Sequence, residues 1–187
     1  GKVSVVDSPA GSVRVKTECD YLVKGQPYGL NHVAYYTILS DGTIRVDNDV
    51  RKLDLDSNSF QVRIGARLPL KKEFDHVEYA ARGPHENYDS RSESSRFGRF
   101  ESSAEAMMGR YVKPQECGNR NGLEWISMQN AKGVGLVITP DSTGNGSVMG
   151  HTAQEMKDCR HQTALPESDR WILRYDAKLD VLIKDPD

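Results

Sequence analysis

Two glutamates lie in the polar middle of the chain, where potentially reactive side chains are most concentrated. Glu86 stands beside His85 and Asn87, and Glu116 follows later in the chain. Paired carboxylates can serve as acid and base, or as acid and nucleophile. Guanidinium groups that could bind carboxylates or a polar ligand lie near both glutamates, at Arg82, Arg91 and Arg120. The residue types allow acid–base chemistry, but we favour a structural network in which these arginines hold the glutamates.

Other residues near the glutamates also admit a binding or a structural interpretation. Tyr88, Tyr111 and Trp125 have rings on which a ligand could stack, but we favour buried positions for them. Asn87 and Asn119 suit turns, because asparagine tolerates the left-handed region of backbone conformation. The five histidines show no HxH or HExxH spacing, so no metal site is predicted.

Composition and charge argue against several classes of protein. The 187 residues carry a formal net charge of −2 with scattered basic residues, so neither nucleic acid nor an anionic membrane is expected as a partner. No apolar run approaches the roughly 20 residues that span a bilayer, which predicts a soluble protein, cytoplasmic or periplasmic. Three cysteines without CxxC spacing predict buried free thiols at Cys19, Cys117 and Cys159.

Alternation of apolar and polar residues indicates strands along most of the chain. The expected strands cover residues 12–16, 33–38, 43–47, 60–65, 77–80, 123–128, 135–139, 171–175 and 181–183. Asp41 and Gly42 form a hairpin signal between the second and third of these strands. The stretch from residue 82 to about 108 shows little periodicity and is expected to be irregular.

One short helix is expected in the C-terminal part of the chain. Thr152 followed by Glu155 matches a capping box, and Met156 and Cys159 are its candidate buried positions. With no linker or internal repeat in view, the pattern predicts one all-β domain over residues 1–187 that contains this helix.

Four segments in order carry a family resemblance. Residues 82–91, Arg-Gly-Pro-His-Glu-Asn-Tyr-Asp-Ser-Arg, resemble the Gly-Pro-x-Glu-Asn-Tyr-x-Asp-Arg signature of the C-terminal small-chain domain of family 2 β-galactosidases. Residues 111–120, Tyr-Val-Lys-Pro-Gln-Glu-Cys-Gly-Asn-Arg, resemble that family's Tyr-Val-x-Pro-Gln-Glu-x-Gly-Asn-Arg segment. Residues 123–125 stand where the family places its next strand, and 152–165 are similar to its Tyr-Thr-x-Glu-x-Leu…His…Leu pattern.

The resemblance implies an antiparallel supersandwich of the galactose-mutarotase type. It also implies a catalytic acid and nucleophile on a separate upstream (β/α)₈ barrel, so the isolated chain is expected to be inactive, with no catalytic residue, metal or cofactor of its own. Its implied partners are that barrel and, indirectly, the galactoside, with association into a homo-oligomer as a further option. The residues expected to rim the substrate or face another domain are Arg82, His85, Glu86, Asn87, Tyr88, Arg91, Glu116, Asn119, Arg120 and Trp125.

The chain departs from the family pattern in two places. Ser90 precedes Arg91 where the family has an aspartate, and the acid stands instead at Asp89, so a family Asp–Arg pairing does not transfer directly. The family's Gly-Gly-Asp-x-Ser-Trp segment, whose tryptophan forms part of the sugar-binding rim, has no counterpart after Tyr175 and Asp176. The family's domain is also longer at its N-terminus, so the resemblance implies a domain trimmed at both ends.

Two other functions remain open at this point. The first is an autonomous carbohydrate-binding module that uses Tyr88, Tyr111 or Trp125. The second is a mutarotase-like epimerase, which would need a His/Glu pair such as His85 with Glu86, or His161 with Glu155. Fold analogy alone prompts the second function, which is an associational argument.

Overall fold

A computed structural model describes residues 1–26, 28–53, 63–109 and 111–179. The chain divides into two compact units, Gly1–Phe60 and Gln61–Asp187. The single domain expected over residues 1–187 stays a prediction. No helix among the described residues is long and apolar enough to cross a membrane.

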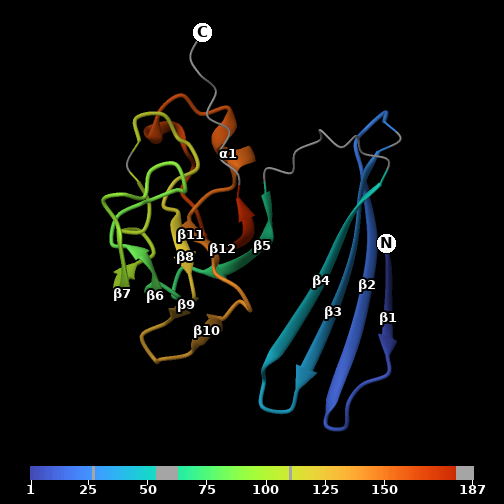
Figure 1. The fold of residues 1–187 in the computed structure, drawn as a ribbon. Helices are drawn as coiled ribbons and strands as arrows, with labels where there is room; N and C mark the ends of the chain where they lie inside the picture. The colour runs from blue at the N-terminus through green and yellow to red at the C-terminus, as the bar shows by residue number, and fades with distance from the viewer. Residues whose placement is uncertain (27, 54–62, 110, 180–187) are drawn as a thin grey trace. The chain divides into compact units, whose positions relative to one another are not determined.

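The first unit is one antiparallel sheet of four strands in the order β1-β2-β3-β4. Its strands are β1 (Lys2–Val6), β2 (Ser12–Leu22), β3 (Gly29–Leu39) and β4 (Ile44–Leu53) (Figure 1). The strands expected at 12–16 and 33–38, and all but the first residue of 43–47, lie inside β2, β3 and β4. The Asp41–Gly42 hairpin signal is confirmed, with Gly42 at a φ of 89° and the Thr43 amide donating to Asp41 Oδ1 at 2.8 Å.

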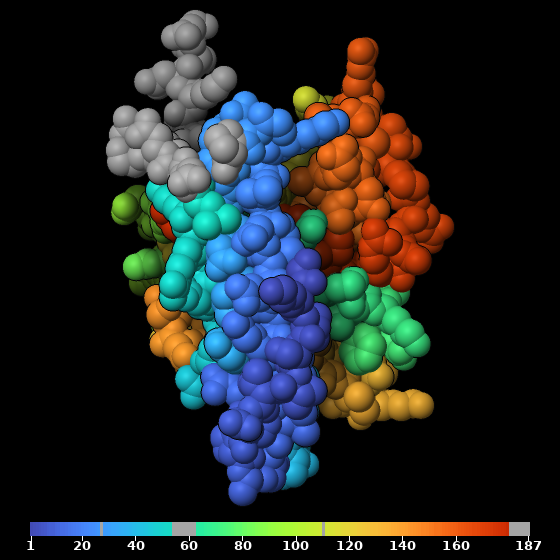
Figure 2. Space-filling model, turned by 90° about the vertical axis from the view of Figure 1, so that its right-hand side faces the viewer, coloured from blue at the N-terminus to red at the C-terminus, as the bar shows by residue number. Residues whose placement is uncertain are grey.

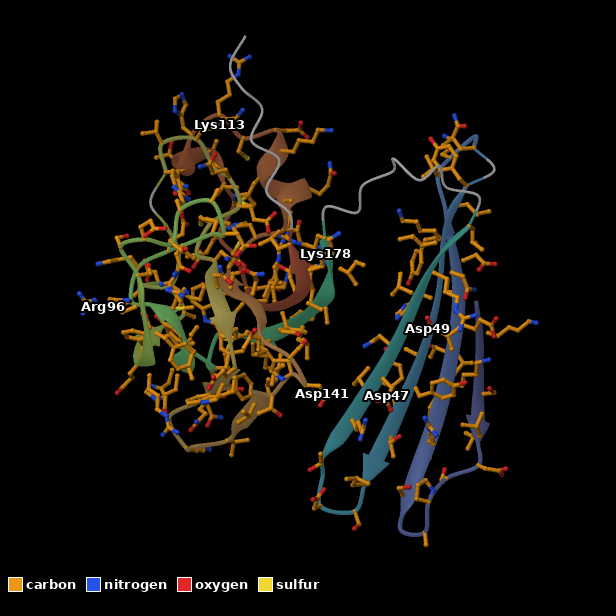
Figure 3. The ribbon with its side chains drawn as sticks, in the orientation of Figure 1. Asp47, Asp49, Arg96, Lys113, Asp141 and Lys178 are labelled. Atoms are coloured by element: carbon orange, nitrogen blue, oxygen red, sulfur yellow. The ribbon has the colours of Figure 1, made fainter. Side chains whose placement is uncertain are left out.

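The strand register gives this sheet one apolar and one charged face. Val5, Val15, Tyr36 and Val46 are paired across the four strands and therefore form one row on the same face. The next row, on the other face, contains Lys16 and Asp47, and the same β4 face carries Asp49 (Figure 3). Figure 2 views this unit from the side of its edge strand β1. Period-two alternation therefore makes the sheet amphipathic.

The second unit contains two four-stranded antiparallel sheets, β10-β9-β6-β7 and β5-β12-β11-β8 (Figure 1). Their strands are β5 (Arg63–Lys71), β6 (His76–Gly83), β7 (Arg96–Ser103), β8 (Arg120–Leu123), β9 (Trp125–Gln129), β10 (Gly135–Ile138), β11 (Gly144–Met149) and β12 (Arg170–Leu179). The described helices are α1 (Ala153–Lys157) and a 3₁₀ turn, η1 (Gln162–Ala164). The predicted all-β antiparallel class with one short α-helix is confirmed, while the supersandwich topology stays a prediction.

The core of the second unit combines residues from both of its sheets. Tyr79 and Ile126 come from one sheet, Val148 and Leu173 come from the other, and all four are at most 1% exposed. Trp171, 6% exposed, belongs to the same cluster. One face of each sheet is therefore buried against the other.

The structure corrects two expectations about strands. β7 lies within the stretch expected to be irregular, from residue 82 to about 108. The strand expected at 123–128 is interrupted at Glu124, where the chain passes from β8 in one sheet to β9 in the other. The expected residues 60–62 and 181–183 lie outside the described part of the chain.

The capping box before α1 is confirmed. The Glu155 amide donates to the Thr152 hydroxyl at 3.2 Å, and the Thr152 amide donates to the Glu155 carboxylate at 2.7 Å. Met156 is buried, as expected. Cys159 lies beyond the helix C-cap, Asp158, and is only partly buried, because α1 ends before its buried face repeats.

All three cysteines are free, but they differ in burial. Cys117 is buried in a small cluster with Met149 and Met156, as predicted for a free thiol. Cys19 lies on β2 and is only partly buried, so the buried position expected for it is wrong.

The core predicts a difference between two valines of the second unit. Val148 on β11 is fully buried and Val137 on β10 is 60% exposed. We expect Val148→Ala to lower the free energy of unfolding by about 2 kcal/mol, because it removes buried methyl groups and leaves a cavity. Val137→Ala should change that free energy by less than about 0.5 kcal/mol. Urea unfolding of both variants measures the difference, and equal losses would contradict the proposed core.

Candidate functional site

Asn87 is the centre of the 82–91 segment, which follows β6. Its side chain is fully buried, and Nδ2 donates to the carbonyl oxygens of Arg82 at 2.8 Å and His85 at 2.9 Å. Oδ1 accepts the backbone amide of Asn121 at 3.0 Å. The carboxamide therefore uses both donor hydrogens and an acceptor, which fixes the turn after β6 and ties it to β8.

Asn119 joins the 111–120 segment to the same turn. Its carbonyl oxygen accepts the Asn87 amide at 2.9 Å, and its Nδ2 donates to the Asn87 carbonyl at 2.8 Å. The same Nδ2 donates to Oδ1 of Asn145 on β11 at 2.9 Å. The two asparagines predicted for turns thus form a buried, reciprocal connection between the two segments.

Glu86 makes a second connection between these segments. One carboxylate oxygen accepts hydrogen bonds from Arg91 and from the Tyr111 hydroxyl, and the other accepts the Gly118 amide at 2.5 Å. Gly118 has a φ of +77°, and a Cβ there would lie 2.5 Å from the Met107 carbonyl oxygen. Only glycine fits this position without strain. This backbone conformation directs the Gly118 amide toward the Glu86 carboxylate.

Tyr88 and Arg91 form the outer part of the cluster. The Arg91 guanidinium carbon lies 4.8 Å from the centre of the Tyr88 ring. Burial, helped by the nearby Glu86 charge, raises the pKa of the Tyr88 hydroxyl well above its usual range. Asp89 accepts a hydrogen bond from the Asn121 side chain. At the departure from the family pattern, Arg91 therefore pairs with Glu86, and Asp89 binds Asn121.

Arg120, the first residue of β8, points into the protein. Its side chain is 4% exposed, and Nε donates to the Tyr79 hydroxyl at 3.1 Å. Nη1 donates to the Gly118 carbonyl at 3.0 Å. Arg82 is exposed, and its Nη1 donates to the Ser95 carbonyl at 3.3 Å. Arg82 and Arg120 therefore bind neutral oxygens. The expected pairing of the three arginines with Glu86 or Glu116 is confirmed for Arg91 and wrong for Arg82 and Arg120.

Glu116 belongs to a separate ionic cluster that sequence reasoning missed. Its carboxylate binds Arg63 on β5 and Arg174 on β12. Arg63 Nε lies 3.1 Å from Oδ2 of Asp176, also on β12. The side chains of Arg174 and Asp176 are only 2% and 5% exposed. The sequence did contain a sign of this cluster. Arg174 and Asp176, of opposite charge and two residues apart, interrupt the apolar run of β12 on the face opposite Trp171.

Asp176 is the residue of this cluster whose pKa is clearly shifted. Burial raises the pKa of its carboxyl group from 3.8 to about 6, and the negative charge of Glu116 acts in the same direction. The positive charges of Arg63 and Arg174 oppose this shift without cancelling it. The cluster therefore contains a carboxyl group that gains a proton in mildly acidic solution.

The remaining candidates lie toward the surface. His85, in the first segment, is exposed. Trp125, the first residue of β9, is half-buried, and the Arg99 guanidinium carbon lies 6.0 Å from its ring centre. Arg96 projects from the start of β7, where the first segment returns to the sheet (Figure 3). Trp125 is therefore not part of the cluster around Glu86 and Asn87.

The cluster favours rigid positioning over acid–base chemistry. Glu86 and Glu116 each hold fixed donors, and they bind different sets of residues. Among the residues that the structure describes, no group of three His, Cys, Asp or Glu side chains could hold a metal ion. The two segments thus form a preorganised surface whose polar atoms are bound internally.

Comparison of the sequence with known proteins shows which family this chain resembles. The family model described as "Beta galactosidase small chain" matches residues 2–182. A β-galactosidase of Priestia megaterium is 25% identical over 89% of this chain and 16% of its own length. β-Galactosidases of Actinobacillus pleuropneumoniae and Arthrobacter sp. are 30% and 33% identical over 77% and 62% of the chain. The chain thus spans at most about a sixth of the length of these relatives.

The Asn87 network predicts a large cost for a nearly isosteric change. Asn87→Asp replaces the Nδ2 donor with an oxygen that faces two carbonyl oxygens, so we expect a loss of about 2–4 kcal/mol in the free energy of unfolding. Asn130→Asp is the matched control, because its Oδ1 only accepts the amides of Lys132 and Val134. Denaturant unfolding near neutral pH measures both variants. Similar stabilities would contradict the central role of Asn87.

Asp176 predicts a stability that depends on pH. Its folded-state pKa of about 6 lies above 3.8, so the folded chain binds the proton more tightly and loses stability as pH rises through this range. Asp176→Asn cannot ionise and should be more stable than the unmodified chain at about pH 8, by up to about 3 kcal/mol, with the difference vanishing below about pH 4. Asp169→Asn, at an 87% exposed side chain, is the control. Lower stability of Asp176→Asn at high pH would show that attraction to Arg63 and Arg174 outweighs burial.

Proposed function

The chain belongs to the β-galactosidase small chain family, and on that premise we propose that it is a non-catalytic C-terminal domain of a β-galactosidase. In this role it supports and rims the active site of an upstream barrel that hydrolyses terminal β-galactosides. The family match and the small share of each relative that the chain covers support a larger catalytic partner within the same enzyme. Its other proposed partners are the galactoside, indirectly, and a second copy of the chain, and no cofactor is proposed for it.

The observation that carries this proposal is the engagement of both candidate glutamates. A glycosidase needs one carboxyl group free to give a proton and a second placed opposite it across the scissile bond. Here Glu86 accepts hydrogen bonds from Arg91, Tyr111 and Gly118. Glu116 is bound by Arg63 and Arg174 instead. Such contacts suit carboxylates that fix loops, and they leave the proposed chemistry to another part of the enzyme.

The contacts also suit a rim that must keep its shape. Asn87, Asn119 and Glu86 bind the two segments to each other, and Asn145 binds them to β11. A surface held in this way can orient a substrate or a neighbouring domain without ordering itself first, which lowers the entropic cost of binding. His85 is an exposed residue of this surface.

The alternative functions find less support in the same contacts. Arg91 lies over the ring of Tyr88 and Arg99 over that of Trp125, so one ring face is already occupied at two of the three candidate sugar platforms. A mutarotase-like epimerase needs a His/Glu pair, but Glu86 is engaged as described. Glu155 is likewise engaged, by its capping box and by Arg170 at 2.7 Å.

The proposal predicts that the isolated chain does not hydrolyse galactosides. We expect no release of nitrophenol from a nitrophenyl β-galactoside above the buffer rate, with a full-length β-galactosidase as the positive control. Ligand-detected NMR with galactose and lactose should likewise show no binding. Turnover by the purified chain would overturn the proposal, and millimolar sugar binding without turnover would favour the carbohydrate-binding module.

The supporting role itself is tested in a full-length enzyme that carries this sequence. Glu86→Gln weakens the contacts with Arg91 and Gly118, so kcat/KM for a galactoside should fall by about tenfold or more if the loops orient the active site. Glu93→Gln is the matched control, because Glu93 is exposed in the same connection between β6 and β7. Equal kinetics for the two variants, with both folded, would argue against the rim.

A further inference from the structure

The outer face of the sheet β10-β9-β6-β7 has an unusual distribution of charge. The strand register places its outward residues in four successive rows, in the order Arg82–Phe97, Trp125–Ala80–Arg99, Val137–Ser127–Glu78–Glu101 and Gly135–Gln129–His76–Ser103. Residues of the opposite face, such as Tyr79 and Ile126, lie in the core. The first two rows carry only positive charges, and both carboxylates lie in the third row.

The two ends of this face also differ in shape and polarity. Phe97 is 53% exposed at the basic end. At the acidic end an open hollow is lined by Glu73, Asp75, His76 and Glu101, among others. His76 lies within 3.0 Å of Glu78 and 3.7 Å of Glu101, so it is already shared between two carboxylates. The face thus offers a protruding aromatic residue with arginines at one end and an acidic hollow at the other.

We propose that this face binds a second copy of the chain through a two-fold axis that lies in the interface and runs perpendicular to the strands. That operation reverses the order of the rows, so the basic end of one copy meets the acidic end of the other. Arg99 then faces Glu101 of the partner subunit, and the contact occurs twice. Phe97 faces the hollow beside Ser103 of the partner subunit. An axis parallel to the strands would instead set like charges against each other.

The composition of the face fits such an interface. Trp, Phe and Arg are enriched in protein interfaces, and Trp and Arg are frequent at their energetic centre. Val137, 60% exposed, extends the apolar surface onto β10. Four strands about 4.8 Å apart and four rows about 7 Å apart cover roughly 500 Å² per copy, below the standard of about 800 Å². We therefore expect a weak dimer that salt dissociates.

The proposed dimer rests on the association with a second copy named above, and it does not depend on the supporting role. A chain that dimerises without supporting any galactosidase would leave the inference intact. An enzyme that needs Glu86 while this chain stays monomeric would leave only the supporting role intact.

Charge reversal at one pair tests the inference sharply. The full 187-residue chain is studied by sedimentation velocity over a range of concentrations, at low and at high salt. Arg99→Glu and Glu101→Arg each place like charges opposite each other in the proposed dimer, so each variant alone should associate at least about tenfold more weakly than the unmodified chain. An equimolar mixture of the two variants restores both opposite-charge contacts and should re-form the dimer.

Matched controls separate this face from a general effect of charge. Arg67→Glu and Glu167→Arg make the same changes at exposed positions outside the four rows and should leave association unchanged. Thermal unfolding checks that every variant is folded. Phe97→Glu provides a further test if one variant is not, because it sets a negative charge against the acidic hollow of the partner subunit and should also weaken association. A chain that stays monomeric at low salt, or a dimer that both reversals leave intact, would overturn the proposal.

Discussion

The structure of the second unit depends on the mutual satisfaction of buried polar groups at Asn87 and Asn119. Asn87 and Asn119, 32 residues apart in the chain, exchange hydrogen bonds between backbone and carboxamide groups in a water-poor environment. An unpaired group there costs more free energy than a formed bond contributes, so the network is stable only when it is complete. The positions of Glu86, Tyr111 and Gly118 follow from this constraint, because their contacts close around the same junction.

In the ionic cluster around Glu116, the cost of burying charges is balanced against the attraction between them. Arg174 and Asp176 are almost fully buried, and burial of charge is costly unless partners compensate for the lost hydration. Glu116 provides a partner from the loop, and Arg63 provides one from β5. Compensation remains incomplete at Asp176, whose pKa rises to about 6. The cluster therefore anchors the loop at some cost in stability near neutral pH.

For the proposed supporting role, these two networks provide a fixed backbone and leave catalysis to another part of the enzyme. Its polar side chains are directed toward each other, which fixes the backbone, while His85 and the rest of the loop tips remain at the surface. Rigid support of this kind is what a neighbouring catalytic domain requires, since small displacements of positioning groups lower rates strongly. The outer face of the sheet β10-β9-β6-β7 shares Arg82, near the end of β6, with the first segment, and its separated charges lie on β6 and β7.

The sequence alone determined the strands whose faces are clearly apolar or polar, the Asp41–Gly42 turn, the capping box at Thr152 and the family of the two signature segments. It did not indicate β7, because Gly98 and Ser102 point inward there while Phe97 points outward, which blurs the alternation. Nor could it show that Glu116 binds Arg63 and Arg174, which lie 53 and 58 residues away in the chain. Local patterns specify local conformation, whereas the partners of buried polar groups depend on which strands the tertiary fold brings together.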